Sequence, residues 1–226
     1  MSFSISSGGW KVLGFAVVFA AGTAYAYQLF TQAKPLPIYQ PRDLNPRLVD
    51  SIALTKGYQH RILDFDLVDQ DGKRVDRSIT EGKIVVADFF FTTCQSICPK
   101  MTTQMKRVAD AYADLDQLLI LSHTVDPETD SIQVLHAYAQ QNNIDTKRWK
   151  LLTGGSKEIY RLARQSYFAA LDEPSKEGPD FVHTENFVLV DTKGRLRGFY
   201  DGTSPEEVDQ LIADIKNLSQ EIKNEN

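Results

Sequence analysis

The sequence predicts an α/β fold, a three-layer sandwich of helices around a sheet, with an N-terminal transmembrane helix. Three observations support this prediction. Nearly continuous apolar runs, of which residues 84–91 are the clearest, are typical of strands buried on both faces. Segments of helical periodicity alternate with these strands along the chain. A long uncharged segment lies near the N-terminus.

Each element has a recognisable start or end. Apolar and polar residues alternate over residues 60–68, and a turn at residues 69–72 follows, which predicts a strand and a hairpin. Pro99 begins a helix that extends to about Leu115, and its Met101 and Met105 are expected in the core rather than as thioether ligands. The other expected elements are strands at 118–125 and 149–152, helices at 131–141 (capped by Asp130 or Ser131) and 156–167, a hairpin of 186–190 with 196–200, and a terminal helix that begins at Ser204-Pro205.

Residues 1–33 are interpreted as a membrane anchor or a signal sequence. No charged residue occurs from Val12 to Ala33, and this length suits a helix that crosses a bilayer of about 30 Å. Aromatic residues lie at both ends of the segment, as is favoured at headgroup depth. Ala24-Tyr25-Ala26 has the small-x-small form of a signal-peptidase site, so a cleaved signal is the alternative. Both interpretations place the following domain on the extracytoplasmic side, in the periplasm or an equivalent compartment.

Residues 34–56 are proline-spaced and lack apolar periodicity, which predicts a semi-extended stalk before a domain at residues 57–226. The formal net charge is −5, and no run of Lys and Arg exceeds two residues. This composition lacks the basic patch that nucleic-acid binding requires, so we expect no nucleic-acid partner.

The chain has only two cysteines, Cys94 and Cys98, where a predicted strand meets a predicted helix. A crossover with cysteines at the helix entrance, followed by a hairpin and a last helix, is the thioredoxin-like arrangement. Free N–H groups and the helix dipole stabilise thiolates at such a position and lower the thiol pKa. Side chains four apart on a helix face the same way, so both sulfurs can bind one ion, and the same pair can also form a disulfide.

Two thiolates and one imidazole are ligands that suit Cu(I), whereas structural zinc would need a fourth strong ligand. His183 is the best placed histidine, because it precedes the strand at 186–190, which we expect beside the strand that leads to the cysteines. His60 and His136 are interpreted as solvent-exposed. His123, at the carboxyl end of a central strand, is a candidate for supporting the ligands. On spacing alone, a structural disulfide is the alternative for the cysteine pair.

Three motifs together resemble those of the SCO/SenC family, copper-binding assembly factors for the Cu(A) centre of cytochrome c oxidase. They occur in the family's order over about residues 57–218. They are FFFTTCQSICP at 89–99, VDPETD at 125–130, and Val182-His183-Thr184 before the strand FVLVD at 187–191. The family's usual Asp-His pair is Val182-His183 here.

The resemblance implies a thioredoxin-like copper metallochaperone. Cys94 and Cys98 would be the thiolate ligands and His183 the imidazole ligand of one copper ion per chain. The implied partners are the oxidase subunit that carries Cu(A), a copper donor protein, and the membrane through the N-terminal helix.

Two other functions are compatible with the fold. A membrane-tethered thiol–disulfide oxidoreductase would use Cys94 and Cys98 as catalytic residues on extracytoplasmic thiols, including those of the oxidase subunit. Such enzymes are expected to have a two-residue spacer and a proline just before the late strand, whereas this spacer has three residues and Pro179 lies well upstream. A peroxiredoxin-like peroxidase would need an arginine near Cys94, and the candidates in the sequence are Arg161, Arg164 and Arg195.

Overall fold

The computed structural model describes residues 10, 14–23, 35–45, 49, 59–170 and 184–225 of the chain. It contains two compact units, Met1–Pro35 and Leu36–Asn226. In the first unit, residues 14–23 form a helix, and the rest of the predicted span at 12–33 lies outside the described residues. No helix within the described ranges is long and apolar enough to cross a membrane.

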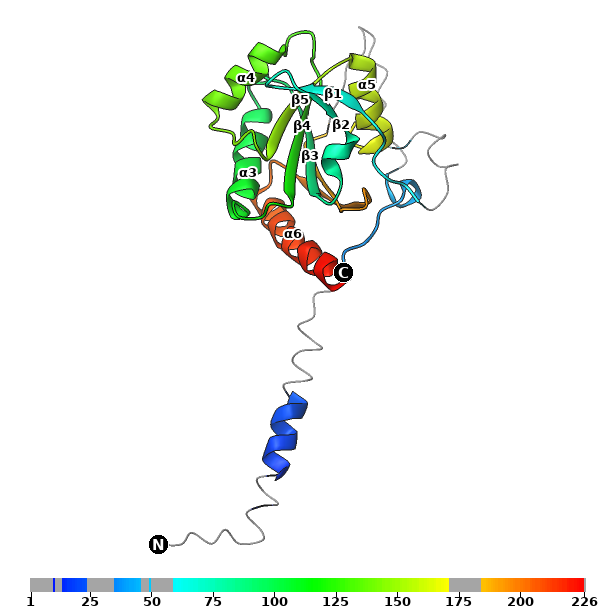
Figure 1. The fold of residues 1–226 in the computed structure, drawn as a ribbon, viewed down its shortest axis with the longest axis vertical. Helices are drawn as coiled ribbons and strands as arrows, with labels where there is room; N and C mark the ends of the chain where they lie inside the picture. Colours follow the sequence, from blue (N-terminus) through cyan, green and yellow to red (C-terminus); the bar gives the residue numbers. More distant parts are fainter. Residues whose placement is uncertain are drawn as a thin grey trace. The chain divides into compact units, whose positions relative to one another are not determined.

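The second unit is an α/β domain whose described residues form a seven-stranded sheet in the order β2-β1-β5-β4-β3-β6-β7 (Figure 1). β3 pairs in parallel with β4, and β4 with β5, while the other pairs are antiparallel. All residues of β3 and β4 are buried, as expected of central strands with continuous apolar runs. The strands are β1 (Asp66–Asp69), β2 (Arg74–Asp76), β3 (Ile84–Phe90), β4 (Leu118–Thr124), β5 (Trp149–Thr153), β6 (Asn186–Val190) and β7 (Leu196–Asp201).

Helices cover both faces of this sheet and form two core layers. In the layer that we call the α3 layer, the apolar sides of α3 (Cys98–Ala111), α4 (Ile132–Gln141) and α6 (Pro205–Glu225) pack together with β3 residues such as Phe90. In the opposite layer, the α5 layer, α5 (Ser156–Arg161) and the π-helix η4 (Leu162–Ser166) pack with β3 residues such as Phe89. The described part of the domain also includes the 3-10 helices η1 (Pro41–Asp43) and η3 (Arg77–Thr80). The predicted three-layer sandwich is confirmed, and Met101 and Met105 lie in its core.

The strand predicted at residues 60–68 is wrong over most of its length, because β1 begins only at Asp66. Ile62, Phe65 and Leu67 are buried in the α5 layer, which explains why these positions are apolar. The backbone there bonds elsewhere, however: the Ile62 N–H donates to the Gly194 carbonyl and the Leu63 N–H to the Ser166 hydroxyl, both at 2.9 Å. The alternation therefore reflects packing without strand pairing.

The first described residues of the second unit, 36–44, belong to the predicted stalk and contact the domain. Tyr39 forms an isolated β-bridge with Leu196 of β7. The buried Arg197 guanidinium donates hydrogen bonds to the carbonyls of Leu36 at 2.7 Å and Pro37 at 3.0 Å. Because β7 is antiparallel to β6 and β6 to β3, Leu196 lies at the amino-terminal end of β3.

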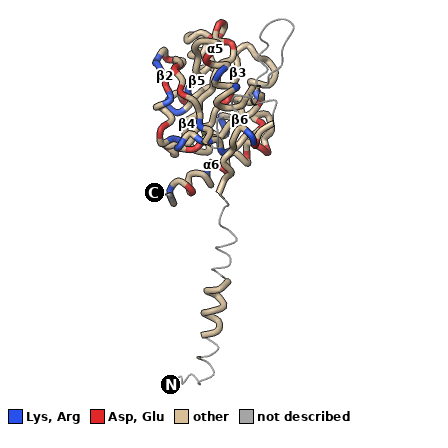
Figure 2. Tube along the Cα trace, turned by 90° about the vertical axis from the view of Figure 1, so that its right-hand side faces the viewer, with Lys and Arg blue, Asp and Glu red and all other residues tan. Residues whose placement is uncertain are grey.

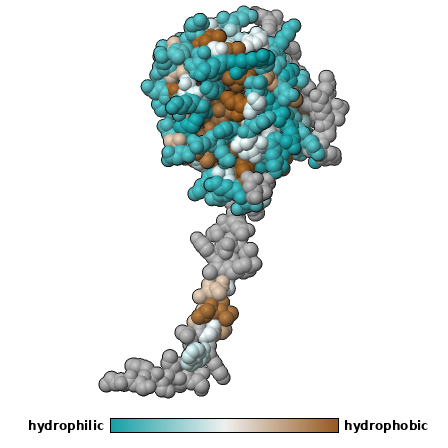
Figure 3. Space-filling view, in the orientation of Figure 1, coloured by the Kyte–Doolittle hydropathy of each residue, from teal (hydrophilic) through white to brown (hydrophobic). Residues whose placement is uncertain are grey.

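The surface of the domain is mixed in charge and polarity. Lys and Arg alternate with Asp and Glu along the trace of the second unit (Figure 2). The face shown in Figure 3 is mostly hydrophilic, with a broad hydrophobic area near the middle of the domain and smaller ones elsewhere.

Candidate metal centre

The two cysteines lie between β3 and α3, in different local structures. Cys98 is the first residue of α3 and is 1% exposed, whereas Cys94 is half-buried in the loop before the helix. The idea that both thiols share one helix face is therefore wrong. The loop instead folds back so that the Cys94 Sγ lies 3.4 Å from the backbone nitrogen of Cys98 and accepts its hydrogen bond. The sulfur thus occupies the place of a cap at the helix N-terminus.

The two thiols have opposite proton affinities. Burial raises the pKa of Cys94, but hydrogen bonds from the Cys98 N–H and thiol and from Ser96 outweigh it and lower the pKa to about 7. For Cys98, burial raises the pKa to about 12, and the nearby Cys94 and Asp88 act in the same direction. The prediction of acidic thiols is right for Cys94 and wrong for Cys98, because Cys98 is removed from water.

This pair has a clear chemical capacity. Both are free thiols, and the lowered pKa of Cys94 favours its thiolate form near neutral pH. Cys98 loses its proton readily only when something compensates the buried negative charge. A soft cation does this by coordination, and a disulfide does it by removing the charge.

Asp88 of β3 is a buried carboxyl group behind the cysteines that the sequence analysis overlooked. It accepts a hydrogen bond from the Ser122 hydroxyl, whose oxygen in turn accepts one from the Trp149 Nε1–H at 2.8 Å. Burial raises the pKa of Asp88 to about 7 against the opposing effect of the Ser122 hydrogen bond. An acidic residue inside the apolar run 84–91 was the signal that could have identified it.

A second buried carboxylate near the cysteine loop is Asp130, in the loop after β4, which the sequence indicated only as a possible helix cap and as part of a family motif. It is fully buried and accepts hydrogen bonds from the N–H and hydroxyl of Thr92 and from the hydroxyl of Thr124. The sequence left Asp130 or Ser131 as the cap of α4. The structure assigns that role to Ser131, whose hydroxyl accepts from the Val134 N–H, and directs Asp130 toward the cysteine loop.

His183, the predicted third ligand, lies outside the described residues. The strand that follows it, β6, pairs antiparallel with β3 as expected, with Val188 opposite Ala87. Among the residues that the structure describes, no group of three or more His, Cys, Asp and Glu side chains could hold a metal ion. His183 therefore stays a prediction.

The other histidines differ in environment. His136 is exposed as predicted, with Asp71 at 3.3 Å. His60 is half-buried, and its Nε2 lies 2.8 Å from the Ser166 carbonyl, so the prediction of a solvent-exposed side chain is wrong. His123 is fully buried in the α5 layer, where its ring stacks on Phe89, and the structure does not bring it to Cys98 in the α3 layer.

The arginines proposed for a peroxidase have other contacts. Arg161 bonds to Glu158 at 2.6 Å, and Arg195 to Asp191 at 2.6 Å. Arg164 lies in η4 of the α5 layer. Nothing in these described contacts links an arginine to Cys94.

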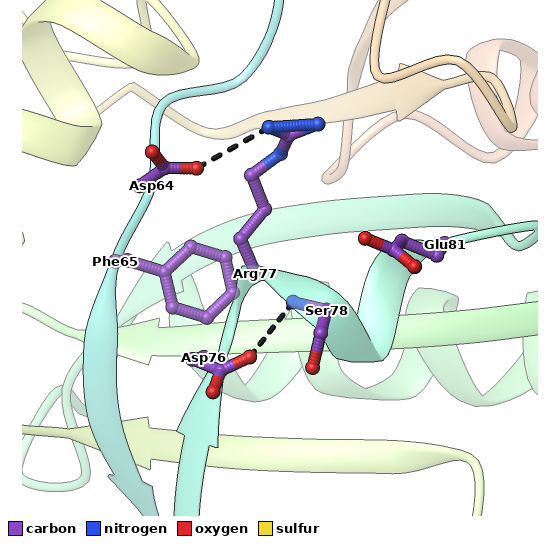
Figure 4. Close-up of a pocket in the computed structure, with 6 residues that line it drawn as sticks. All are labelled: Asp64, Phe65, Asp76, Arg77, Ser78 and Glu81. Atoms are coloured by element: carbon purple, nitrogen blue, oxygen red, sulfur yellow. Dashed lines mark hydrogen bonds and ion pairs between the residues drawn. The ribbon is translucent and has the colours of Figure 1, made fainter.

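A pocket of about 290 Å³ lies beside η3 and includes neither cysteine (Figure 4). Its main charges are paired locally. Arg77 bonds to Asp64 at 3.2 Å, and the Asp76 carboxylate accepts the Ser78 N–H at 2.8 Å. We therefore place the candidate site at the cysteines and not in this pocket.

Comparison with known proteins identifies the family of the chain. The SCO1/SenC family model matches residues 55–220. The SCO1 protein homolog of Bacillus subtilis is 34% identical over 163 residues, which cover 71% of this chain and 83% of that protein. A second relative is BsSco, a member of the Sco family of cytochrome c oxidase assembly proteins in which a disulfide switch was identified. Its solved structure is 32% identical in sequence and matches with a TM-score of 0.62, over 71% of this chain and 94% of the BsSco chain.

Bradyrhizobium japonicum ScoI, solved with copper bound, has 27% identity and a TM-score of 0.56, over 70% of this chain and 99% of its own. The matched region contains the whole sheet and both cysteines. The shared sequence and the shared thioredoxin-like fold lead to one conclusion: this chain belongs to the SCO1/SenC family.

Proposed function

We propose that this protein is a copper chaperone that binds one copper ion and helps assemble the Cu(A) centre of cytochrome c oxidase. The observation that carries the proposal is the cysteine pair, in which a half-buried thiol with a pKa of about 7 lies 3.4 Å from the first helical N–H of the other cysteine. Thiolates so placed suit a soft cation, and copper is bound in the ScoI relative.

Cys94 and Cys98 would hold the copper as thiolates, with the imidazole of His183 as the third ligand. Cys94 offers its thiolate at neutral pH, and Cys98 releases its proton as the cation compensates the buried charge. His183 is proposed because it precedes β6, which pairs with the strand that leads into the cysteine loop. Soft thiolates with one imidazole favour Cu(I).

The proposal includes the site of action. We propose that the uncharged segment at 12–33 anchors the protein and that the domain lies on the extracytoplasmic side of the membrane. The partners would be a copper donor protein and the oxidase subunit that carries Cu(A).

Copper titration of the reduced, full-length protein tests this function. We expect one Cu(I) per chain, measured against a competing chelator. Cys94→Ser, Cys98→Ser and His183→Ala should each weaken binding by more than the roughly 10–100-fold that loss of an outer partner of a ligand causes. His136→Ala, which changes an exposed histidine, is the control. A wild-type protein that binds no Cu(I) would refute the proposed function. Unchanged copper affinity in His183→Ala would exclude His183 as a ligand.

A second candidate function is thiol–disulfide exchange, favoured by the contrast between an acidic, accessible Cys94 and a buried Cys98. The Cys94 thiolate would attack a substrate disulfide and form a mixed disulfide, and Cys98 would then displace the substrate thiol. The substrate is reduced to a dithiol and the pair is oxidised to a disulfide. A reductase assay separates the functions, because this activity should survive His183→Ala and be lost in Cys94→Ser.

A further inference from the structure

Asp130 connects the loop that carries the cysteines to the end of the neighbouring strand. Its side chain is fully buried. One of its oxygens accepts the Thr92 N–H at 3.1 Å, and the carboxylate also accepts the hydroxyl hydrogens of Thr92 and Thr124. These donors come from two segments, the start of the cysteine loop and the end of β4.

The contacts explain why a carboxylate is tolerated there. A buried carboxylate is strongly unfavourable unless donors surround it, and hydrogen bonds to an ionised acceptor are stronger than neutral ones. The α4 helix does not require Asp130, because Ser131 already caps it. The Val125 N–H also donates to the Phe90 carbonyl at 2.8 Å, so the loops after β3 and β4 are joined at two neighbouring points.

Thr92 lies only two residues before Cys94, so a fixed Thr92 defines where the cysteine loop begins. The Cys94 N–H donates to the Phe91 carbonyl at 3.4 Å, and its sulfur accepts the Cys98 N–H at 3.4 Å. At the other end, Cys98 is buried in the α3 layer. The loop is thus held by α3 at its end and by Asp130 at its start.

We propose that Asp130 is a positioning residue for the cysteine pair, which holds residues 92–98 in the conformation that brings the Cys94 sulfur to the start of α3. Asp130 acts through Thr92 and does not itself bind the metal. The expected effect of Asp130 on copper affinity rests on the proposed function, whereas its expected effect on the reactivity of the Cys94 thiol does not.

The test compares Asp130→Asn with Asp69→Asn in the full-length protein. Asp69 is a matched control, because it is also buried and accepts two backbone N–H groups, from Asp71 and Lys73, both at 2.9 Å. It lies on β1, which β5 and β4 separate from β3. We expect Cu(I) affinity to fall about 10–100-fold in Asp130→Asn, as for other residues that orient ligands, and to stay at the wild-type value in Asp69→Asn.

A second readout does not involve copper. The rate at which iodoacetamide modifies Cys94 is followed against pH, with the modified peptide identified by mass spectrometry. In Asp130→Asn the midpoint should move upward, toward the pKa of about 8.5 of an ordinary thiol, because the loosened loop no longer keeps the sulfur at the Cys98 N–H. Asp69→Asn should retain the wild-type midpoint.

Thr92 provides the same test with little risk of misfolding. Thr92→Val removes the hydroxyl donor to Asp130 and should shift both readouts in the direction of Asp130→Asn. Thr92→Ser keeps the hydroxyl and should have the copper affinity and alkylation midpoint of the wild type. If Asp130→Asn does not fold, this pair decides the question.

The outcomes are distinct. An Asp130→Asn variant with wild-type copper affinity and wild-type alkylation midpoint, and a Tm lowered only as in Asp69→Asn, would show a merely structural carboxylate and overturn the proposal. If the wild-type protein binds no Cu(I), the proposed function fails, and the alkylation midpoints alone decide the role of Asp130.

Discussion

The two core layers each bury one ionisable side chain from a central strand, with different surroundings. In the α3 layer, Asp88 of β3 is hydrogen-bonded by Ser122. In the α5 layer, His123 of β4 stacks on Phe89 with ring centroids 4.9 Å apart. Its Nδ1 lies 3.3 Å from the Asp88 backbone carbonyl, and within the described residues its buried Nε2 has no hydrogen-bond partner.

Burial drives both groups toward their neutral forms, but only one affects the thiols. Burial raises the pKa of Asp88 to about 7 and lowers that of His123 to about 4. The charge of Asp88 also raises the pKa of Cys98, which shares its layer. The sheet thus lies between a buried carboxyl group that raises the pKa of Cys98 and a buried imidazole in the opposite layer. Three predictions test this separation.

The largest expected effect is the difference between the two thiols. With pKa values of about 7 and about 12, Cys94 should be far more reactive than Cys98 at pH 7. The lower intrinsic nucleophilicity of the more acidic thiolate offsets part of this difference, which leaves a rate ratio of at least about 100-fold. Iodoacetamide labelling followed by peptide mass spectrometry measures it. Similar labelling rates at both cysteines would contradict the difference in burial between Cys98, in the α3 layer, and Cys94, in the loop before the helix.

The next effect is the pH dependence that Asp88 confers on stability. Its folded-state pKa of about 7 exceeds the ordinary 3.8, so the stability it provides is present at low pH and is lost as the pH rises through 7. From pH 5 to pH 8, the wild type should lose about 2–3 kcal/mol of unfolding free energy relative to Asp88→Asn. Urea denaturation at both pH values checks this. Iodoacetamide should also label Cys98 faster in Asp88→Asn, because a repelling negative charge is gone. If the unfolding free energies of the wild type and the variant change equally from pH 5 to pH 8, Asp88 does not titrate in this range.

The smallest effect, and the one of opposite sign, concerns His123. Its folded-state pKa of about 4 lies below the ordinary 6.5, so its contribution is present above pH 6.5 and is lost as the pH falls through 4. His123→Phe keeps a ring against Phe89 and should avoid a loss of about 2 kcal/mol between pH 7.5 and pH 5. Cys94 labelling and Cu(I) affinity should match the wild type. A changed labelling rate would mean that the α5 layer does influence the thiols.

The sequence predicted the central strands closely, because a strand buried on both faces leaves a continuous apolar run. The run at 84–91 corresponds to β3, and the run at 118–125 to β4. The start of β1 was not predictable in this way. Phe65 and Leu67 are two positions apart, as on one face of a strand, but the backbone of residues 62 and 63 bonds to distant parts of the chain, including Gly194.

The site was found from the sequence only in outline. The isolated cysteines at a strand–helix junction identified it, and the motifs identified the family. The opposite pKa shifts could not be read in advance, because they depend on how much of each sulfur the folded domain removes from water. Asp130 reaches Thr92 across 38 positions, and His60 reaches Ser166 across 106, so neither contact leaves a local pattern. His183 as a ligand stays a prediction.

The hydrogen bonds from Arg197 to the carbonyls of Leu36 and Pro37 fix where the polypeptide enters the domain. The polypeptide enters the domain beside the amino-terminal end of β3, whereas the sulfurs follow its carboxyl-terminal end. The point where residues 36 and 37 are fixed and the two sulfurs therefore lie at opposite ends of β3. Substituting Arg197 should loosen residues 36 and 37 while leaving the reactivity of Cys94 unchanged.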